Sequence, residues 1–434
     1  MAARAIAGSR RHHFMNVRLS LKIPRMRFPG AYRQLLASRQ MRLLLAGLGI
    51  SSLGDGISTV TIAWLAVRTA PSGSLGLFVG FAVAAYTLPG VLGGLTLGRI
   101  LRGRPARALV LGHCLLRAGC LSLIAVLAAV GALTPPAYLA LLAASSLMAA
   151  WGNAGEYTML SALAGADGRF AVNSLASAQA SFAYIIGPLV AGLLLAIFSP
   201  GWLLLLDAAS FAVLGGAAWL TRTNAGAADN PVDLKAAESG FRLLRRRDLL
   251  SLTALTWLFF FLYGPVEVAL PVYVAHDLGA SAQLLAAYWT AFGIGALASN
   301  LLTGALRAGN VRRIALLIVA GWGACLIPFV AAPIPVTVVF FGIGGVVYGP
   351  FVPLTYALYQ SATATKNLPA VLAARSAVLM VSTPLGTALG GPIVGALGAT
   401  LTLFSSGVAT VLLAAAGAVA WRDEAYVAKT IEQI

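Results

Sequence analysis

Among the charged residues inside long apolar stretches of this chain, five stand out: Asp55, Arg117, Glu156, Asp207 and Glu267. A charged side chain at the centre of a bilayer costs about 2.5–3.5 kcal/mol on insertion scales, so such residues usually carry ions or bind substrates. Withdrawal from water favours the protonated form of a carboxylate, which a proton carrier requires. We therefore expect Asp55 and Glu267 to couple to protons, and Arg117 and Glu156 to balance charge or bind substrate.

Structural roles compete with these interpretations. Asp55 could be an acid paired with Arg117, whose guanidinium does not lose its proton in proteins and must find a partner. That partner would be Asp55, Glu156 or an anionic substrate. Glu156 lies near the predicted cytoplasmic end of its apolar stretch, where water could hydrate it. Asp207 lies close to a predicted helix end, which favours a structural role.

The elements that position these residues are membrane helices. The 434 residues are 59% hydrophobic and 10% charged, whereas soluble proteins are about 25% charged. Stretches of about 20 apolar residues span a bilayer as helices. Twelve such stretches occur, at 43–67, 75–98, 108–131, 137–158, 172–197, 201–221, 249–275, 282–305, 314–332, 335–360, 370–397 and 400–421.

The net charge of +17 does not indicate a nucleic-acid binder, because the basic residues alternate from loop to loop. Ten of the 30 lysines and arginines lie in residues 4–42, and further groups lie at 99–107, 222–247 and 307–313. The intervening connections are poor in them, with Arg68 as the exception. This positive-inside pattern predicts a bacterial inner-membrane protein with both termini in the cytoplasm.

The chain repeats itself. Gly187-Pro188 through Gly192 resembles Gly391-Pro392 through Gly395 at an offset of 204, and the basic loops at Arg99 and Arg307 are 208 apart. The repeat predicts two pseudo-symmetric six-helix bundles around a central cavity. We divide the chain into a basic N-terminal arm, a first bundle, a cytoplasmic linker, a second bundle and a cytoplasmic tail, at 1–40, 41–221, 222–248, 249–421 and 422–434.

Three segments resemble the major facilitator superfamily, and in particular its drug and siderophore efflux branch, which includes the enterobactin exporter and the macrolide efflux proteins. They are Leu43–Ala66 around Asp55, the run from Asn173 through Gly192 to Phe211, and Gly264–Ala280. The resemblance extends over essentially the whole chain. It implies a twelve-helix, all-α fold and transport by alternating access.

The loop after the second predicted span departs from that family. The family's loop carries an acid that helps to latch the cytoplasmic side, and Gly98 stands in its place here. We expect a cytoplasmic gate loop comprising Gly94, Gly98, Arg99, Arg102 and Arg104, with a latch built differently. The arginine that many drug–proton antiporters carry in span 4 is also missing, so their coupling scheme does not transfer.

Two further sets of residues have expected roles. The aromatic candidates for lining the cavity are Tyr86, Trp257, Tyr263, Trp289, Tyr348 and Tyr356. The candidates for close helix packing are Gly187, Pro188, Gly192, Gly391, Pro392 and Gly395, because small residues let helix backbones approach. We expect no cofactor and no metal, since the chain has no phosphate-binding loop and its cysteines and histidines lack metal-ligand spacing.

The sequence therefore predicts a monomeric secondary transporter, and not an enzyme, that exports a small amphipathic molecule in exchange for protons. Its partners would be the lipid bilayer, the substrate and protons, with no nucleic acid. Two alternatives stay open at this point. One is an importer or facilitator of a nutrient or ferri-siderophore on the same fold, and the other is a non-transporting sensor or scaffold.

Overall fold

The computed structural model describes residues 35–101, 103–221, 240–303, 311–364 and 367–432. Within these residues the chain is helical and contains no strand, as predicted. The predicted arm lies almost wholly outside the described residues, as do most of the linker and Arg102. Side chains beyond Trp421 in the predicted tail are also not described.

Eleven helical segments of the described chain are long and apolar enough to cross a membrane. Each matches one of the twelve predicted spans to within a few residues. The remaining prediction, 282–305, corresponds to α11, Ala282–Thr303, which is not among the eleven. This helix packs between α7 of the first half and α13 of the second. The all-α membrane fold is therefore confirmed.

The first half contains seven of the described helices. They are α2 (Arg39–Thr69), α3 (Leu75–Thr96), α4 (Gly98–Leu101), α5 (Ala106–Ala129), α6 (Pro135–Ser146), α7 (Ala149–Leu194) and α8 (Pro200–Leu220). The side chain of Ser38 caps the first of these by accepting a hydrogen bond from the Met41 backbone N–H, 3.4 Å away. Proline occupies the first turn of α6 and of α8, where its missing N–H is not needed.

The second half follows the same order of long helices, several of them broken. They are α10 (Arg247–Val272), η1 (Tyr273–Asp277), α11, α12 (Val311–Leu326), η2 (Ile327–Val330), α13 (Ile334–Tyr348), α14 (Phe351–Ala362), α15 (Leu368–Leu379), α16 (Ser382–Leu397) and α17 (Ala399–Glu432). Pro265 and Pro271 lie inside α10, which continues into the π-helical turn η1. This span is therefore continuous through both prolines and changes its helical geometry only at Tyr273.

The expected connection between predicted spans 4 and 5 lies inside α7. Gly165 leaves the helical conformation there, with a φ of +66°, and separates the fourth span, Pro135–Gly165, from the fifth, Ala171–Leu194. Glycine reaches this left-handed region without steric cost, so it can redirect the chain sharply. The fourth span is also broken earlier, between Ser146 at the end of α6 and Ala149 at the start of α7.

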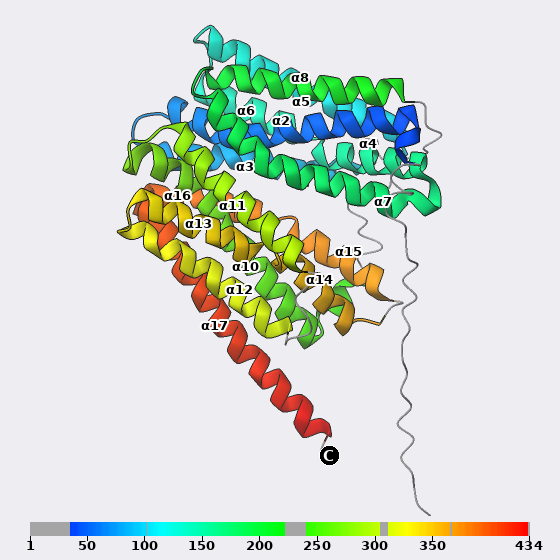
Figure 1. Ribbon diagram of the computed structural model, residues 1–434, viewed down its shortest axis with the longest axis vertical. Helices are drawn as coiled ribbons and strands as arrows, with labels where there is room; N and C mark the ends of the chain where they lie inside the picture. Colours follow the sequence, from blue (N-terminus) through cyan, green and yellow to red (C-terminus); the bar gives the residue numbers. More distant parts are fainter. Residues whose placement is uncertain (1–34, 102, 222–239, 304–310, 365–366, 433–434) are drawn as a thin grey trace, which may run out of the picture.

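The helices of the two halves form two groups in Figure 1, with α2–α8 above and α10–α17 below. The groups meet where α3 packs on α16 and where α7 packs on α11. A Cβ added at Gly80 would lie 2.5 Å from the Gly391 Cα, and one added at Gly76 would lie 3.0 Å from the Gly395 backbone nitrogen. The α3–α16 seam is therefore a backbone-to-backbone contact that only glycine permits.

The predicted glycine motifs lie at close helix contacts. A Cβ at Gly187 would lie 2.9 Å from the Ile57 backbone nitrogen, so α7 and α2 approach closely within the first half. Gly192 faces Ala286 across the α7–α11 contact. Gly240, the first described residue after the predicted linker, packs against α15, with a Cβ position 2.9 Å from that of Ala374.

Candidate functional site

Asp55, Arg117 and Tyr86 form one polar cluster in the first half. The Arg117 guanidinium of α5 donates to Asp55 Oδ1 of α2 and also to the Tyr86 hydroxyl of α3. The Tyr86 hydroxyl donates to the same Asp55 oxygen at 3.1 Å. Three helices are thus joined at the level of Asp55, and the predicted pairing of Arg117 with Asp55 is present.

Aromatic rings hold the Arg117 guanidinium in place. Its central carbon lies 4.6 Å from the ring centroid of Tyr86 and 4.7 Å from that of Phe211. These distances are typical of cation–π contacts, which gain strength away from water. His113, one turn earlier on α5, packs edge-on against Phe211 at 5.5 Å. Its Nδ1 and the Arg117 Nε have no hydrogen-bond partner among the described residues.

Asp55 opens into a cavity of about 200 Å³ that also contains Glu156. The polar part of its wall also includes His113 and Asn153. Glu156 is only 8% exposed, so it is more buried than a hydrated helix end would be. The cavity therefore brings together two of the embedded acids, beside the arginine that neutralises one of them.

Asp207 is fully buried in α8 and is held by two serines. Ser58 Oγ donates to its Oδ2 at 2.5 Å, and Ser210 Oγ donates to its Oδ1 at 3.1 Å. Helix α8 begins at Pro200, so Asp207 lies about two turns inside the helix and the expectation of a place near its end is wrong. The reason is that the capping residue, Ser199, lies eight positions earlier.

Glu267 lies in α10, in the second half. Thr387 Oγ1 of α16 donates to its Oε2 at 3.1 Å. The carboxylate lies on the walls of two cavities. The smaller, about 150 Å³, lies between the halves and is also lined by Tyr86 and Trp289. The larger, about 590 Å³, lies within the second half.

The aromatic candidates separate into two groups. Tyr86 and Trp289 line the smaller cavity, and Tyr263, Tyr348 and Tyr356 line the larger one. Trp257 instead stacks on Phe261 of the same helix, with ring centroids 5.1 Å apart, and is not among the residues lining either cavity.

Arg375 is a charged residue of the site that the sequence analysis did not single out. It lies in α15, is 4% exposed and lines the larger cavity together with Glu267. Its guanidinium carbon lies 4.2 Å from the Tyr356 ring centroid and 5.2 Å from that of Tyr359. The signal was available, because Arg375 lies inside the predicted span 370–397 and meets the same criterion as Arg117.

The predicted gate loop is described only in part. Gly94 is buried near the end of α3, and the short helix α4 begins at Gly98. Arg104 is exposed, the side chain of Arg99 is not described, and Arg102 lies outside the described residues. The role of this loop as a gate stays a prediction.

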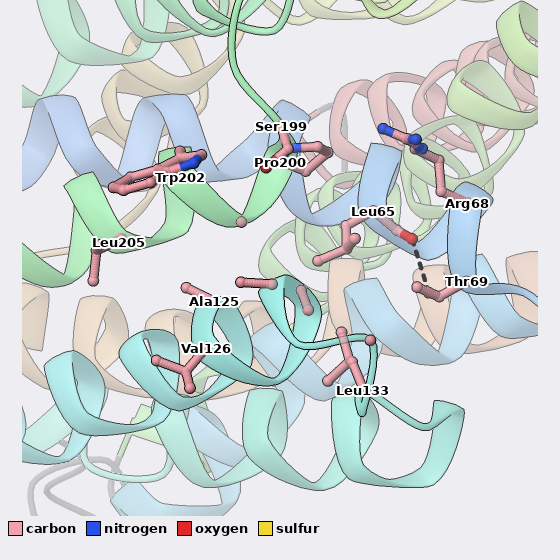
Figure 2. Close-up of a pocket in the computed structure, with 14 residues that line it drawn as sticks. Leu65, Arg68, Thr69, Ala125, Val126, Leu133, Ser199, Pro200, Trp202 and Leu205 are labelled. Carbon is pink, nitrogen blue, oxygen red and sulfur yellow. Dashed lines mark hydrogen bonds between the residues drawn. The ribbon is translucent and has the colours of Figure 1, made fainter.

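A separate cavity of about 470 Å³ lies between the ends of α2, α5 and α8 (Figure 2). Its wall includes Leu65, Val126, Pro200 and Trp202, and Arg68 is the charged residue among those that line it. Thr69 Oγ1 donates to the Leu65 carbonyl at 2.8 Å at its edge. None of the five embedded charges lines this cavity, so we place the site in the cavities around Asp55 and Glu267.

Comparisons with known proteins agree with this architecture. The family model described as Major Facilitator Superfamily matches residues 44–288 and 252–433. A comparison with curated protein sequences finds no match.

Solved structures with a similar fold include three transporters. The nucleoside transporter NupG is 15% identical with a TM-score of 0.63, over 88% of this chain and 99% of that one. A D-xylose–proton symporter is 15% identical with a TM-score of 0.63, over 86% and 96%. An auto-inhibited POT family peptide transporter is 11% identical with a TM-score of 0.67, over 89% and 97%. At these identities the likeness shows the fold alone.

Proposed function

This chain belongs to the Major Facilitator Superfamily of membrane transporters, and we propose that it exports a small amphipathic organic molecule in exchange for protons. The molecule would be a siderophore or a drug-like compound, as the resemblance to the efflux branch implies. The location would be a bacterial inner membrane, with both termini in the cytoplasm.

The position of Glu267 carries this proposal. Its carboxylate lies on the wall of the cavity between the halves and on the wall of the aromatic cavity of the second half. A proton taken up from the first cavity can therefore affect what is bound in the second. The volume of the second, about 590 Å³, is within the range of small-molecule sites, about 300–1,000 Å³.

The contact between the halves indicates the state of the transporter. The halves are in backbone contact at the seam of Gly80 and Gly391. Arg375 follows Ala374, which contacts Gly240, so the aromatic cavity lies toward the end of the second half that holds Gly240. With that end in the cytoplasm, the cavity is positioned to receive a cytoplasmic substrate, and rocking of the halves would expose it to the other side.

Asp55 is the second proposed proton carrier, with Arg117 as its charge partner. A proton arriving at Asp55 would compete with the guanidinium for the carboxylate and loosen the contact between α2 and α5. Movement of one proton inward yields about 2.3 kcal/mol per 100 mV of membrane potential. One proton per cycle therefore supports a gradient of several tens-fold for a neutral substrate.

Inverted membrane vesicles loaded with the transporter test this proposal. We expect the dyes rhodamine 110 or rhodamine 123 to accumulate inside when respiration acidifies the lumen, and to leave when nigericin and valinomycin together collapse the pH gradient and the membrane potential. Glu267→Gln and Asp55→Asn should insert normally but lose the gradient-driven accumulation. Asp248→Asn, in the first turn of α10, is the matched carboxylate-to-amide control and should transport like the parent.

Two results would contradict the proposal. If both acid variants accumulate dye like the parent, the proton-carrier assignment is wrong. If the parent accumulates dye equally well after nigericin and valinomycin have collapsed both the pH gradient and the membrane potential, the transporter does not use a proton gradient.

A further inference from the structure

Two opposite charges lie unpaired on the wall of one cavity. Glu267 and Arg375 both line the cavity of about 590 Å³. Within the described residues, neither has an oppositely charged group within 4.0 Å. The Glu267 carboxylate has one hydrogen bond, from Thr387, and the buried Nε of Arg375 has none.

The first half shows the alternative arrangement. There Arg117 and Asp55 pair directly, so the two charges neutralise each other without a ligand. In the second half the arginine instead lies against the rings of Tyr356 and Tyr359. Ring faces attract a guanidinium but do not neutralise its charge. A buried charge without an ionic partner is costly, so the site is arranged for charged groups that arrive with a ligand.

The rest of the wall selects the body of that ligand. Phe260, Tyr263, Phe292, Tyr348 and Tyr356 line the same cavity. Phe292 and Tyr348 have ring centroids 5.4 Å apart, and Tyr263 and Tyr348 are 5.7 Å apart. Aromatic groups at such spacings favour another ring packed edge-on or offset.

We propose that this cavity binds a ring-bearing molecule that carries both an acidic and a basic group. The acidic group would pair with Arg375 and the basic group with Glu267, while the rings of the cavity enclose the body. This assignment rests on the proposed function and adds a substrate class to it. It also explains exchange, because a proton and the basic group of the substrate compete for the same Glu267 carboxylate.

A matched pair of dyes measures how much the acidic group of the ligand contributes to binding. Rhodamine 110 carries a carboxylate beside its cationic ring system, and rhodamine 123 is its methyl ester. Binding to the purified full-length transporter in detergent, without any gradient, is measured by fluorescence polarisation. We expect rhodamine 110 to bind at least about tenfold more tightly, as hydrogen bonds to charged groups usually allow.

Substitutions assign the two charges. Arg375→Gln should remove the preference for rhodamine 110 while rhodamine 123 binds as before. Arg375→Lys, which keeps the charge, should retain most of the preference. Arg312→Gln is the control, because Arg312 lies over the Trp421 ring at 5.7 Å and is not among the residues lining this cavity. Glu267→Gln should weaken the binding of both dyes.

The parent protein alone can overturn the inference, even if a variant fails to fold. Equal affinity for the two dyes, or binding of neither, would show that the cavity does not recognise both charges. An unchanged preference in folded Arg375→Gln would remove Arg375 from the site. Proton-driven transport with equal dye affinities would overturn this inference alone, whereas a dye preference without proton-driven transport would overturn only the proposed coupling.

Discussion

The ion pair between Arg117 and Asp55 is asymmetric, because the Arg117 side chain is 8% exposed and the Asp55 side chain is 47% exposed. Water can therefore reach the carboxylate but scarcely reaches the guanidinium. The arginine depends on the pair for its only ionic partner among the described residues. The acid can exchange its partner for water or a proton at lower cost.

This asymmetry predicts unequal effects of two substitutions. Asp55→Asn leaves a buried charge unpaired, which costs at least about 1–3 kcal/mol of unfolding free energy. Arg117→Gln leaves a half-exposed carboxylate that water can solvate, so its cost should be smaller. Unfolding titrations in detergent measure both. The double variant Asp55→Asn, Arg117→Gln should recover part of the loss, and additive losses would show that the pair is not coupled.

The Gly80–Gly391 seam predicts a conformational block. Gly80→Val places a side chain where the Gly391 Cα lies, 2.5 Å from the new Cβ, so the seam cannot close and transport should be lost. A cysteine at Thr59, which lines the cavity between the halves, reports the state in a background without the native cysteines. Its labelling by an impermeant maleimide from the outer side should rise in Gly80→Val.

Gly119→Val is the matched control for the seam, because a Cβ at Gly119 meets no atom within 4 Å. It should transport normally and leave the labelling of the reporter cysteine unchanged. Normal transport by Gly80→Val would instead show that the seam does not close during the cycle.

The Ser58–Asp207 hydrogen bond predicts a loss of stability rather than of transport. Ser58→Ala removes the donor at 2.5 Å from a fully buried carboxylate, which should lower the unfolding free energy by about 1–3 kcal/mol. Thr61→Val also removes a buried hydroxyl from α2, but one that bonds only the Ile57 carbonyl of its own helix, at 2.8 Å. It should cost clearly less, and equal losses would contradict an anchoring role for Asp207.

The hydrogen bonds of Asp277 predict that its substitution destabilises the start of α17. Its Oδ2 accepts hydrogen bonds from the Thr400 backbone N–H at 3.1 Å and from the Thr400 hydroxyl at 2.6 Å. Asp277→Ala should therefore cost about 0.5–2 kcal/mol, as the loss of a helix cap does. Amide hydrogen exchange should rise in the first turn of α17. His276→Ala removes an exposed side chain whose Nδ1 contacts the other carboxylate oxygen of Asp277, Oδ1, at 3.1 Å, and it should leave that exchange unchanged because both Thr400 hydrogen bonds go to Oδ2.

The sequence predicts the spans well because a membrane helix can be recognised from the composition and length of its apolar stretch alone. The connection between the fourth and fifth spans was expected, but neither its turning point at Gly165 nor the short break after Ser146 was. Glycine is so frequent in this chain, at 47 residues, that no single one is marked by the sequence as a turning point.

The types of the charged residues were predictable, but their grouping was predictable only in part. Asp55 and Arg117 were expected partners, because a guanidinium inside an apolar stretch must find a partner. The grouping of Arg375 with Glu267 depends instead on how α15 packs beside α10, which no spacing along the chain encodes. Asp207 shows the same limit, because its burial follows from Ser58 of α2 facing α8. The substrate branch inferred from the family resemblance stays a prediction.

The glycine seam between α3 and α16 has a consequence for how readily the two halves part. Among the described residues, the side-chain hydrogen bonds of these helices stay within their own halves. Separation at the seam therefore breaks dispersion contacts, each worth about 0.1–0.2 kcal/mol. The side-chain hydrogen bonds of both helices stay intact. The two halves can therefore separate at this seam at a low cost in free energy. The binding energy of one substrate molecule or one proton is then enough to shift the equilibrium between the closed and the open seam.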